Sequence, residues 1–393
     1  MWFSVYAVAT CALWTLVFAG FVWNVRRVPR MEDERRASSE PQIPWPRLSV
    51  IVPACNEGEH IEAAVGSLLA QDYPALEVVA VDDRSTDATG EILDRMARTE
   101  PRLTVLHVDS LPAGWLGKVN AMQQGVQAAT GEWLLFTDAD VHYEPAALRH
   151  AVDYARRFGA DHLTLTPRFV LDGFWLAVAV RTFGLLLFLM ARAGSVNSPG
   201  SKTPFGIGAF NLVRSDLFAR TPGFAWLKLE PGDDFGLGMM VRAAGGRTRL
   251  AFAEQDLSIR WYPSVRAMFA GLEKNTFGPG AQYSVWRLAV SALALVLLTI
   301  GPPAAAVVGV VTGSPVLLGA ASVAIASHVI ASLLLVRGER SEISSLLCFP
   351  VGMLMFVAMV LRSSIKCLRN GGIDWRGTHY SIDELRAGQR VKF

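Results

Sequence analysis

A run of 21 residues without a charged side chain, 3–23, restricts the fold of this chain more than any other feature of its sequence. A helix of this length can cross the hydrocarbon core of a bilayer. The run is longer than the apolar core of a signal peptide, and no small-residue cleavage site follows it. Arg26, Arg27 and Arg30 come next, so the positive-inside rule predicts that the following domain faces the cytoplasm. Residues 1–25 are therefore expected to form a membrane anchor.

Further apolar segments toward the C-terminus predict additional membrane helices. They lie near 286–311, 316–336 and 346–361, within a predicted membrane region of 285–364. A Gly-Pro-Pro sequence at 301–303 is expected to kink or split the first of them. We therefore expect a multi-pass protein of the inner membrane of the cell, with a cytoplasmic catalytic domain.

The side on which the C-terminal tail, 365–393, lies is ambiguous in the sequence. Three crossings after a cytoplasmic domain would place the tail outside. Arg362, Lys366 and Arg369 flank the last apolar segment, however, and favour the inside. Either one segment is re-entrant, or the number of crossings differs from this count.

The overall composition excludes some classes of partner. The chain is 51% hydrophobic and 18% charged, with a net charge of +2, and it has no basic stripe with interleaved aromatic residues. Nucleic acid is therefore not an expected partner. The four cysteines show no metal-binding or redox spacing, which fits a domain in a reducing cytosol.

A polar linker at 26–47 is followed by a segment, 48–168, in which short β-type runs alternate with helical periodicity. The predicted strands are LSVIVPA, LEVVAVDD, LTVLHVD, EWLLFTDAD and DHLTLTP, and the predicted helices between them are EGEHIEAAVGSLLAQ, STDATGEILDRMART, KVNAMQQGVQAAT and PAALRHAVDYARRFG. This alternation is typical of an α/β sandwich with a mostly parallel sheet. Ligands of such sheets bind at the carboxyl ends of the strands.

The next part of the chain, 169–284, is predicted to be a separate acceptor-binding part. It opens with an apolar segment, 174–193, that is nearly long enough to cross a membrane. A crossing would put the polar residues that follow on the opposite side from 48–168. We therefore expect a helix in the membrane surface, with Arg181 and Arg192 on one face toward the lipid headgroups.

Acidic and amide side chains follow three of the predicted strands. The first strand ends in Pro53–Glu57, the second in Asp82–Asp87, and a later one in Asp138 and Asp140. Each motif alone is as easily a turn or a helix cap. Three such motifs at successive strand ends favour a functional site.

The Asp138-x-Asp140 pair suits a hard divalent cation. Mg²⁺ and Mn²⁺ prefer one or two carboxylates together with water and phosphate oxygens. In an extended segment the two side chains project to the same face, so both could approach one diphosphate–metal unit. His142 lies close by, but a lone histidine beside an acid is more often structural.

The order of these motifs resembles a known family. Pro-x-x-Asn-Glu, Asp-Asp-x-Ser-x-Asp, Gly-Lys-x-x-Ala and Asp-x-Asp occur in the order found in glycosyltransferase family 2. GWLGKVNAM and GDDFGLG resemble its membrane-bound, lipid-glycosylating branch, which includes ceramide glucosyltransferase-like and carotenoid- or hopanoid-associated enzymes. The resemblance covers roughly 48–280, and the closing IDWRGTHY resembles the tail of such proteins more weakly. It implies a nucleotide-sugar-binding α/β sandwich of GT-A type, with an N-terminal transmembrane helix and a C-terminal helical membrane domain.

The resemblance also implies roles for individual residues on the donor side. Pro53, Asn56 and Glu57 would border the nucleotide, and Asp83 would contact its base or ribose. Lys118 is similar to the family's loop lysine near the diphosphate. As a solvent-exposed lysine at a helix start it would oppose the helix dipole.

Asp138 and Asp140 would, by the same resemblance, handle the ribose and an Mg²⁺ or Mn²⁺ ion, with Asp140 the direct ligand. The family's base motif is usually Glu-Asp, whereas this chain has Asp233-Asp234 at the start of a predicted helix. In the family the Asp of this motif is the base, so the resemblance assigns the general base to Asp234 and keeps Asp233 in reserve. A carboxylate beside another acid has a raised pKa and can take a proton from a hydroxyl. A helix cap is the plain alternative.

Two further segments match the family in part. GIGAFNLVR includes Gly208, which would let backbone approach the sugar or acceptor closely, although a glycine-bent strand explains it equally well. Processive synthases carry Gln-x-x-Arg-Trp, and here Arg260 and Trp261 match while Leu257 replaces the glutamine. A role of Arg260 and Trp261 near the acceptor or pyrophosphate is expected.

The sequence as a whole predicts an inverting, metal-dependent glycosyltransferase. It would move a sugar from a nucleotide-sugar, with a UDP-linked donor expected, to a hydroxyl of a membrane lipid at the cytoplasmic face. Two alternatives stay open: a processive polysaccharide synthase, and a non-catalytic lipid- or nucleotide-binding protein on the same scaffold. The sugar, the lipid and the oligomeric state do not follow from the sequence.

Overall fold

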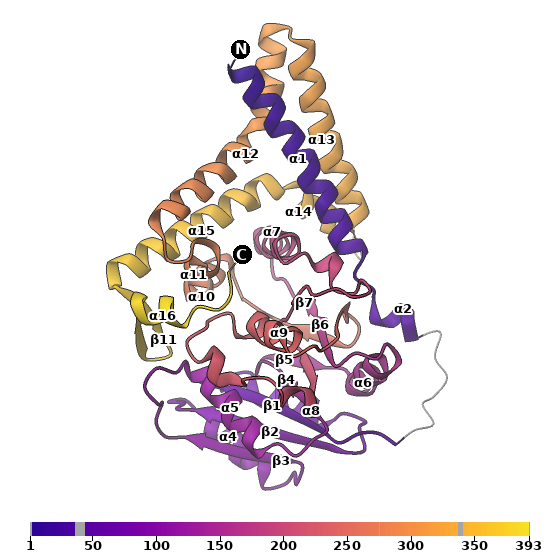
Figure 1. The fold of residues 1–393 in the computed structure, drawn as a ribbon, viewed down its shortest axis with the longest axis vertical. Coiled ribbons are helices and arrows are strands. Elements are labelled where there is room, and N and C mark those ends of the chain that lie inside the picture. Colours follow the sequence, from indigo (N-terminus) through magenta and orange to yellow (C-terminus); the bar gives the residue numbers. More distant parts are fainter. Residues whose placement is uncertain (1, 36–43, 275, 337–340, 393) are drawn as a thin grey trace.

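The computed structural model describes residues 2–35, 44–274, 276–336 and 341–392. An α/β domain forms the lower part of the molecule, and long helices rise from it (Figure 1). The elements at the N-terminal side are α1 (Trp2–Arg26) and α2 (Met31–Arg35).

A seven-stranded sheet lies at the centre of the α/β domain, with the order β3-β2-β1-β4-β8-β6-β9. Neighbouring strands are parallel except at β8, which runs antiparallel to both β4 and β6. The sequence prediction of a mostly parallel sheet is therefore confirmed for the first four strands. The strands are β1 (Leu48–Ala54), β2 (Leu76–Asp83), β3 (Leu103–Val108), β4 (Trp133–Phe136), β6 (His162–Thr166), β8 (Asn211–Arg214) and β9 (Thr248–Phe252).

Helices pack on both faces of this sheet because successive side chains of a buried strand point to opposite faces. Val50 and Val52 of β1 lie in one core cluster with residues of α3 and α6. Ile51, between them, lies in another cluster with residues of α5 and α9. The four helices are α3 (Ile61–Leu69), α5 (Gly117–Ala128), α6 (Ala147–Arg157) and α9 (Asp233–Ala243), with α4 (Thr89–Ala97) beside β3.

The central sheet includes strands from both sides of the boundary expected at residue 168. The segment after it supplies β8, which inserts between β4 and β6, and β9, which pairs with β6. A small second sheet, β5-β10-β7, also joins both parts. Strand pairing between distant segments therefore makes 48–259 one domain, and its remaining short elements are β5 (Val141–Tyr143), β7 (Arg168–Phe169), α8 (Ser215–Phe218) and β10 (Leu257–Ile259). The helix α10 (Val265–Gly271) follows this domain.

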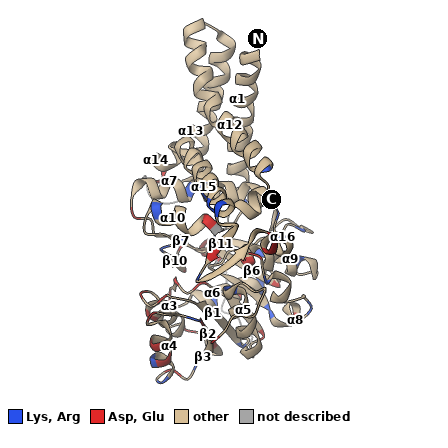
Figure 2. Cartoon of the chain, turned by 90° about the vertical axis from the view of Figure 1, so that its left-hand side faces the viewer, with Lys and Arg blue, Asp and Glu red and all other residues tan. Residues whose placement is uncertain are grey.

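The long helices α1, α12 (Val285–Thr312) and α13 (Pro315–Leu335) run side by side away from the α/β domain (Figure 1). Charged residues are absent from their outer parts and gather on the α/β domain, as Figure 2 shows. Together with α15 (Phe349–Asn370), these helices are the four in the described part of the chain that are long and apolar enough to cross a membrane. The Gly-Pro-Pro sequence does not split α12, which continues through Pro302 and Pro303.

The apolar segment at 174–193 forms α7 (Phe174–Met190), but its two arginines do not share a helix face. Arg192 lies beyond the helix end with a left-handed backbone. Arg181 forms an ion pair with Glu342 of α14 (Ser341–Leu347), at 3.7 Å, and donates to Ser345. The expectation of two arginines facing headgroups is therefore wrong, because α14 and α15 pack against α7 and offer Arg181 an acidic partner.

The C-terminal tail packs against the α/β domain. Its elements are β11 (Gly372–Trp375), β12 (Thr378–Ser381) and α16 (Ile382–Gly388), which follow α15. The Tyr380 hydroxyl donates to the Trp115 carbonyl at 3.1 Å, and the backbone N–H groups of Arg390 and Val391 donate to Glu230. The tail and the α/β domain therefore lie on the same side of the α1–α12–α13 bundle (Figure 1), and α11 (Phe277–Ala281) leads into that bundle.

Candidate active site

One cavity of about 1690 Å³ extends from the carboxyl ends of β1 and β4 to the helices α7, α12 and α15. The end nearer the sheet is polar, and we call it the donor end; Asp138, Asp140, Lys118 and Asp234 line it. The end nearer the long helices is apolar, and we call it the acceptor end. The strand-end acids that the sequence indicated therefore do come together.

Lys118 links the two acidic motifs at the donor end. It is the second residue of α5, and its Nζ lies 2.8 Å from an oxygen of Asp138 and 3.3 Å from one of Asp233. Burial by itself would lower the pKa of Lys118, but the carboxylates of Asp138, Asp233 and Asp234 outweigh it and raise that pKa above its ordinary value. Lys118 therefore keeps its positive charge at neutral pH.

Gly208 joins the same two motifs through its backbone. Its N–H donates to Asp234 at 2.9 Å, and its carbonyl accepts from the N–H of Asp138 at 3.1 Å. A Cβ at Gly208 would lie 2.5 Å from Asp138 Oδ2, and one at Gly206 would lie 1.9 Å from the Asp234 carbonyl oxygen. In this structure the two glycines therefore let the acidic motifs approach each other.

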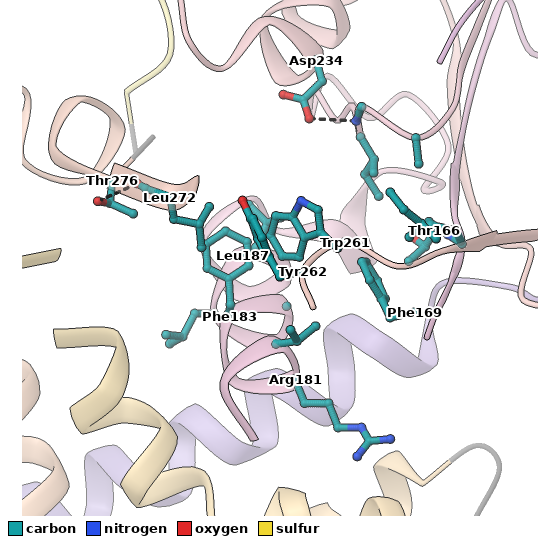
Figure 3. A pocket seen from close by; sticks show the side chains of 18 of the residues that line it. Thr166, Phe169, Arg181, Phe183, Leu187, Asp234, Trp261, Tyr262, Leu272 and Thr276 are labelled. Atoms are coloured by element: carbon teal, nitrogen blue, oxygen red, sulfur yellow. Dashed lines mark hydrogen bonds between the residues drawn. The ribbon is translucent and has the colours of Figure 1, made fainter. Parts of the chain in front are cut away.

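Asp234 occupies the first turn of α9 and faces the donor end, where Figure 3 shows its carboxylate toward the cavity. Burial, and then the neighbouring carboxylate of Asp233, raise the pKa of Asp234 to about 7. Asp233 differs, because its side chain is only 7% exposed and is paired with Lys118. Both acids line the cavity, and Asp234 is the more exposed of the two.

Asp140 carries no hydrogen bond or ion pair to a side chain among the described residues, although it lies in the wall of the cavity. Burial, and then the carboxylates of Asp138 and Glu57, raise the pKa of Asp140 to about 7. Carboxylates such as those of Asp138 and Asp140 are ligands that a divalent metal ion prefers. The described residues contain no group of three histidine, cysteine, aspartate or glutamate side chains around one point, so such an ion would need water or phosphate oxygens as well.

The residues expected around the nucleotide separate into two groups. Pro53, Glu57 and Asp83 line the donor end. Asp83 accepts two hydrogen bonds from Arg84, at 2.8 and 3.1 Å. Asn56 is not among the described residues that line the cavity; its side-chain oxygen accepts from the Thr86 N–H at 2.7 Å and holds the loops after β1 and β2 together.

Arg260 and Trp261 lie in the cavity wall beyond β10. Arg260 forms an ion pair with Asp172. Trp261 packs against Phe169 and Phe183, with ring centroids 5.9 and 5.4 Å apart. In Figure 3, Trp261 lies between Asp234 and Phe183, so it stands where the donor end meets the acceptor end.

The acceptor end is built from helices that are far apart in the sequence. Its walls are the apolar faces of α7, α12 and α15, with side chains such as Phe183, Leu187, Leu295 and Phe356. Of these helices, α12 and α15 are long and apolar enough to cross a membrane, and α7 is a shorter apolar helix. The cavity therefore connects an acidic pocket with an apolar space.

The sequence reasoning missed the contribution of the tail to this site. Trp375, Arg376 and Val391 line the cavity, and Arg376 pairs with Glu57 at 2.8 Å. Glu230, just before the Asp233-Asp234 motif, accepts from the backbone of the tail. The signal available in the sequence was the closing IDWRGTHY, whose position at the chain end gave no reason to place it beside residue 57.

Comparison with known proteins identifies the domain. Residues 49–221 match the model of Glycosyl transferase family 2. Residues 49–221 therefore form a glycosyl transferase family 2 domain, and its fold is of GT-A type.

Particular relatives extend the comparison beyond that domain. The chain is 23% identical to 4,4'-diaponeurosporenoate glycosyltransferase of Staphylococcus aureus over 351 residues, 86% of this chain and 89% of that protein. It is 29% identical to beta-monoglucosyldiacylglycerol synthase of Synechocystis over 178 residues, 39% of this chain and 37% of that protein. Three other bacterial relatives match over only 27% to 42% of their own length.

A solved structure shows the same fold. The mannosyltransferase PcManGT from Pyrobaculum calidifontis, in complex with GDP-Man and Mn²⁺, superimposes with a TM-score of 0.52 at 20% sequence identity. The match covers 91% of this chain and 99% of that structure. It therefore includes the helical part as well as the α/β domain.

Proposed function

We propose that this protein is an inverting, divalent-metal-dependent glycosyltransferase that moves a sugar from a UDP-linked donor to a hydroxyl of a membrane lipid. The observation that carries the proposal is the single cavity, which joins the donor end to an apolar space between candidate membrane helices. A water-soluble donor suits the first end, and a lipid suits the second. The similarity to a beta-monoglucosyldiacylglycerol synthase and to a 4,4'-diaponeurosporenoate glycosyltransferase supports the proposal.

Asp234 would serve as the general base. Its pKa of about 7 lets the carboxylate take a proton from an acceptor hydroxyl at neutral pH. The acceptor oxygen then attacks the anomeric carbon, the bond from that carbon to the donor diphosphate breaks, and the diphosphate leaves on the opposite face. One displacement of this kind inverts the configuration at the anomeric carbon.

The leaving diphosphate carries the charge that grows during the reaction. Lys118 would stabilise it from the start of α5, next to Asp138. Asp140, with Asp138 as a helper, would hold an Mg²⁺ or Mn²⁺ ion, which would neutralise further charge on the phosphate oxygens. A structural neighbour is described with Mn²⁺ and a nucleotide-sugar, which supports the proposal of a metal.

The arrangement of the helices suggests how the protein sits in a membrane. We propose that α1, α12 and α13 cross the inner membrane, while α15 returns along the cytoplasmic side. Both the start of α15, at Phe349 against Phe21 of α1, and its end at the tail lie toward the α/β domain. This path accounts for Arg362, Lys366 and Arg369 on the same side as the catalytic domain, with no fourth crossing.

The experiment that tests this function uses membranes that contain the protein and UDP-sugars labelled in the sugar. We expect label to pass into a lipid extract, with release of UDP and with one sugar residue per lipid. If UDP were released and no lipid became labelled, the acceptor would not be a membrane lipid. Long water-soluble chains of labelled sugar would instead indicate a processive synthase.

A further inference from the structure

The hairpin β11–β12 in the C-terminal tail is fixed to the donor end of the cavity. Tyr380 of β12 donates to the Trp115 carbonyl at 3.1 Å, just before the loop that leads to Lys118. Thr378 accepts from Arg84 at 3.2 Å, and Arg84 in turn holds Asp83. The hairpin therefore contacts both loops that border the donor end.

Arg376 is placed at the tip of this hairpin by an unusual turn. Trp375 pairs with Thr378, so Arg376 and Gly377 are the two turn residues. Their φ angles are 48° and 77°, which is the type I′ pattern that normally takes asparagine, aspartate or glycine. A long cationic residue held with a left-handed backbone at the wall of a cavity suggests a role beyond the turn itself.

The side chain of Arg376 reaches across to the end of β1. It pairs with Glu57 at 2.8 Å and lies beside Cys55. Glu57 is close enough to Asp140 to contribute to the raised pKa of that residue. Arg376 is thus the partner of one carboxylate in the group that surrounds the expected diphosphate position.

A bound donor would add the negative charge of its diphosphate to the donor end, where a further cation would stabilise it. Lys118 forms ion pairs with Asp138 and Asp233. Two arginines also have acidic partners: Arg84 pairs with Asp83, and Arg260 pairs with Asp172. A diphosphate would add negative charge to a pocket that already contains these acids. The guanidinium of an arginine has five N–H donors, so the pair with Glu57 leaves Arg376 able to bind phosphate oxygens as well.

We propose that Arg376 is a donor-binding residue whose guanidinium contacts the diphosphate of the nucleotide-sugar, and that the hairpin β11–β12 forms a wall of the donor site. This inference rests on the proposed function, because it needs a nucleoside diphosphate at the donor end. It adds a residue of the C-terminal tail to the donor-binding residues.

The test measures binding of UDP and UMP to the purified full-length protein in detergent, in the presence of Mg²⁺, by calorimetry. Arg376→Ala is expected to weaken UDP binding roughly tenfold to a hundredfold, as the loss of charged hydrogen bonds would. UMP binding should change much less, because UMP lacks the outer phosphate. Arg376→Lys should restore part of the UDP affinity, and Arg386→Ala, in α16 of the same tail, should leave it unchanged.

The outcomes separate the two proposals. If the wild-type protein does not bind UDP, the proposed UDP donor fails and this inference falls with it. If the wild-type protein binds UDP and Arg376→Ala binds it equally well, the inference alone is overturned. An equal loss of UDP and UMP affinity in both Arg376 variants would also overturn it, because it would show a structural role for the hairpin.

Discussion

The donor end and the acceptor end of the cavity are built in different ways. At the donor end, charged side chains at strand ends and helix starts make short polar contacts. Lys118 pairs with Asp138 at 2.8 Å, and the backbone N–H of Gly208 donates to Asp234 at 2.9 Å. At the acceptor end, three helices meet through apolar side chains, and one glycine of α7, Gly184, leaves open space where a side chain could stand.

The difference indicates a division of labour. Charge pairs are directional, so the donor end can hold reacting groups in a defined geometry. Apolar contacts are not directional, so the acceptor end can accept chains of different shape. Changes at the first end should therefore affect turnover, and changes at the second should affect the affinity for the acceptor.

The largest effect is expected from Asp234→Asn. This variant keeps the shape of the side chain but cannot take a proton, so turnover should fall by about a hundredfold to ten-thousandfold. Turnover is measured at saturating donor and acceptor, and binding of UDP should persist. Asp233→Asn is the matched control, and its turnover should fall less. If turnover fell more in Asp233→Asn than in Asp234→Asn, Asp233 would be the base.

Removal of the metal site is expected to have the next largest effect. Asp140→Ala, or addition of EDTA to the wild-type protein, should lower transfer by about a hundredfold, because charge on the leaving group would lose its counter-ion. Asp109→Ala is the control, since Asp109 also follows a strand but is exposed and lies outside the cavity. Near-normal activity in EDTA would contradict a metal role.

The pH dependence of turnover tests the role of Asp234 as general base without any substitution. A base with a raised pKa of about 7 is protonated at lower pH, so turnover should fall as the pH drops below 7, by roughly tenfold for each unit. Above pH 7 the carboxylate is charged and turnover should level off. If turnover stayed constant from pH 5 to pH 8, Asp234 would not be the general base.

The smallest effect is expected at the acceptor end. A Cβ at Gly184 would meet no atom within 4 Å, so Gly184→Leu should fill part of the apolar space without disturbing the protein. The KM for the lipid acceptor should rise severalfold, while UDP binding stays unchanged. Gly66→Leu in α3 is the control, because its Cβ would also meet nothing and it does not line the cavity. If the KM for the lipid acceptor were equal in the two variants, the lipid would not bind at this end of the cavity.

Much of the donor end could be predicted from local sequence. The bounds of β1 and β2 agree with the predicted runs, and the acids that follow them reach one edge of the sheet because the strands are parallel. The helix that begins at Asp233 was also predicted. Each of these features depends on a few neighbouring residues, namely an apolar run and the polar residues that end it.

The acceptor end and the tail depended on contacts between distant segments. A sequence pattern could identify α7 and α15 as apolar helices, but it could not show that they enclose one cavity with α12. It also could not show that Arg181 would find Glu342 rather than headgroups. These pairings are set by packing, in which many weak contacts decide among alternatives that look alike in the sequence.

The sequence by itself determined the class of domain, the apolar helices and the acidic residues of the donor end, because these follow from local periodicity and from residue chemistry. Only the tertiary structure decided that β8 lies between β4 and β6, and that the tail returns to place Arg376 against Glu57. The physical reason is separation along the chain. Partners more than 300 residues apart, as Glu57 and Arg376 are, meet only when the whole fold brings them together.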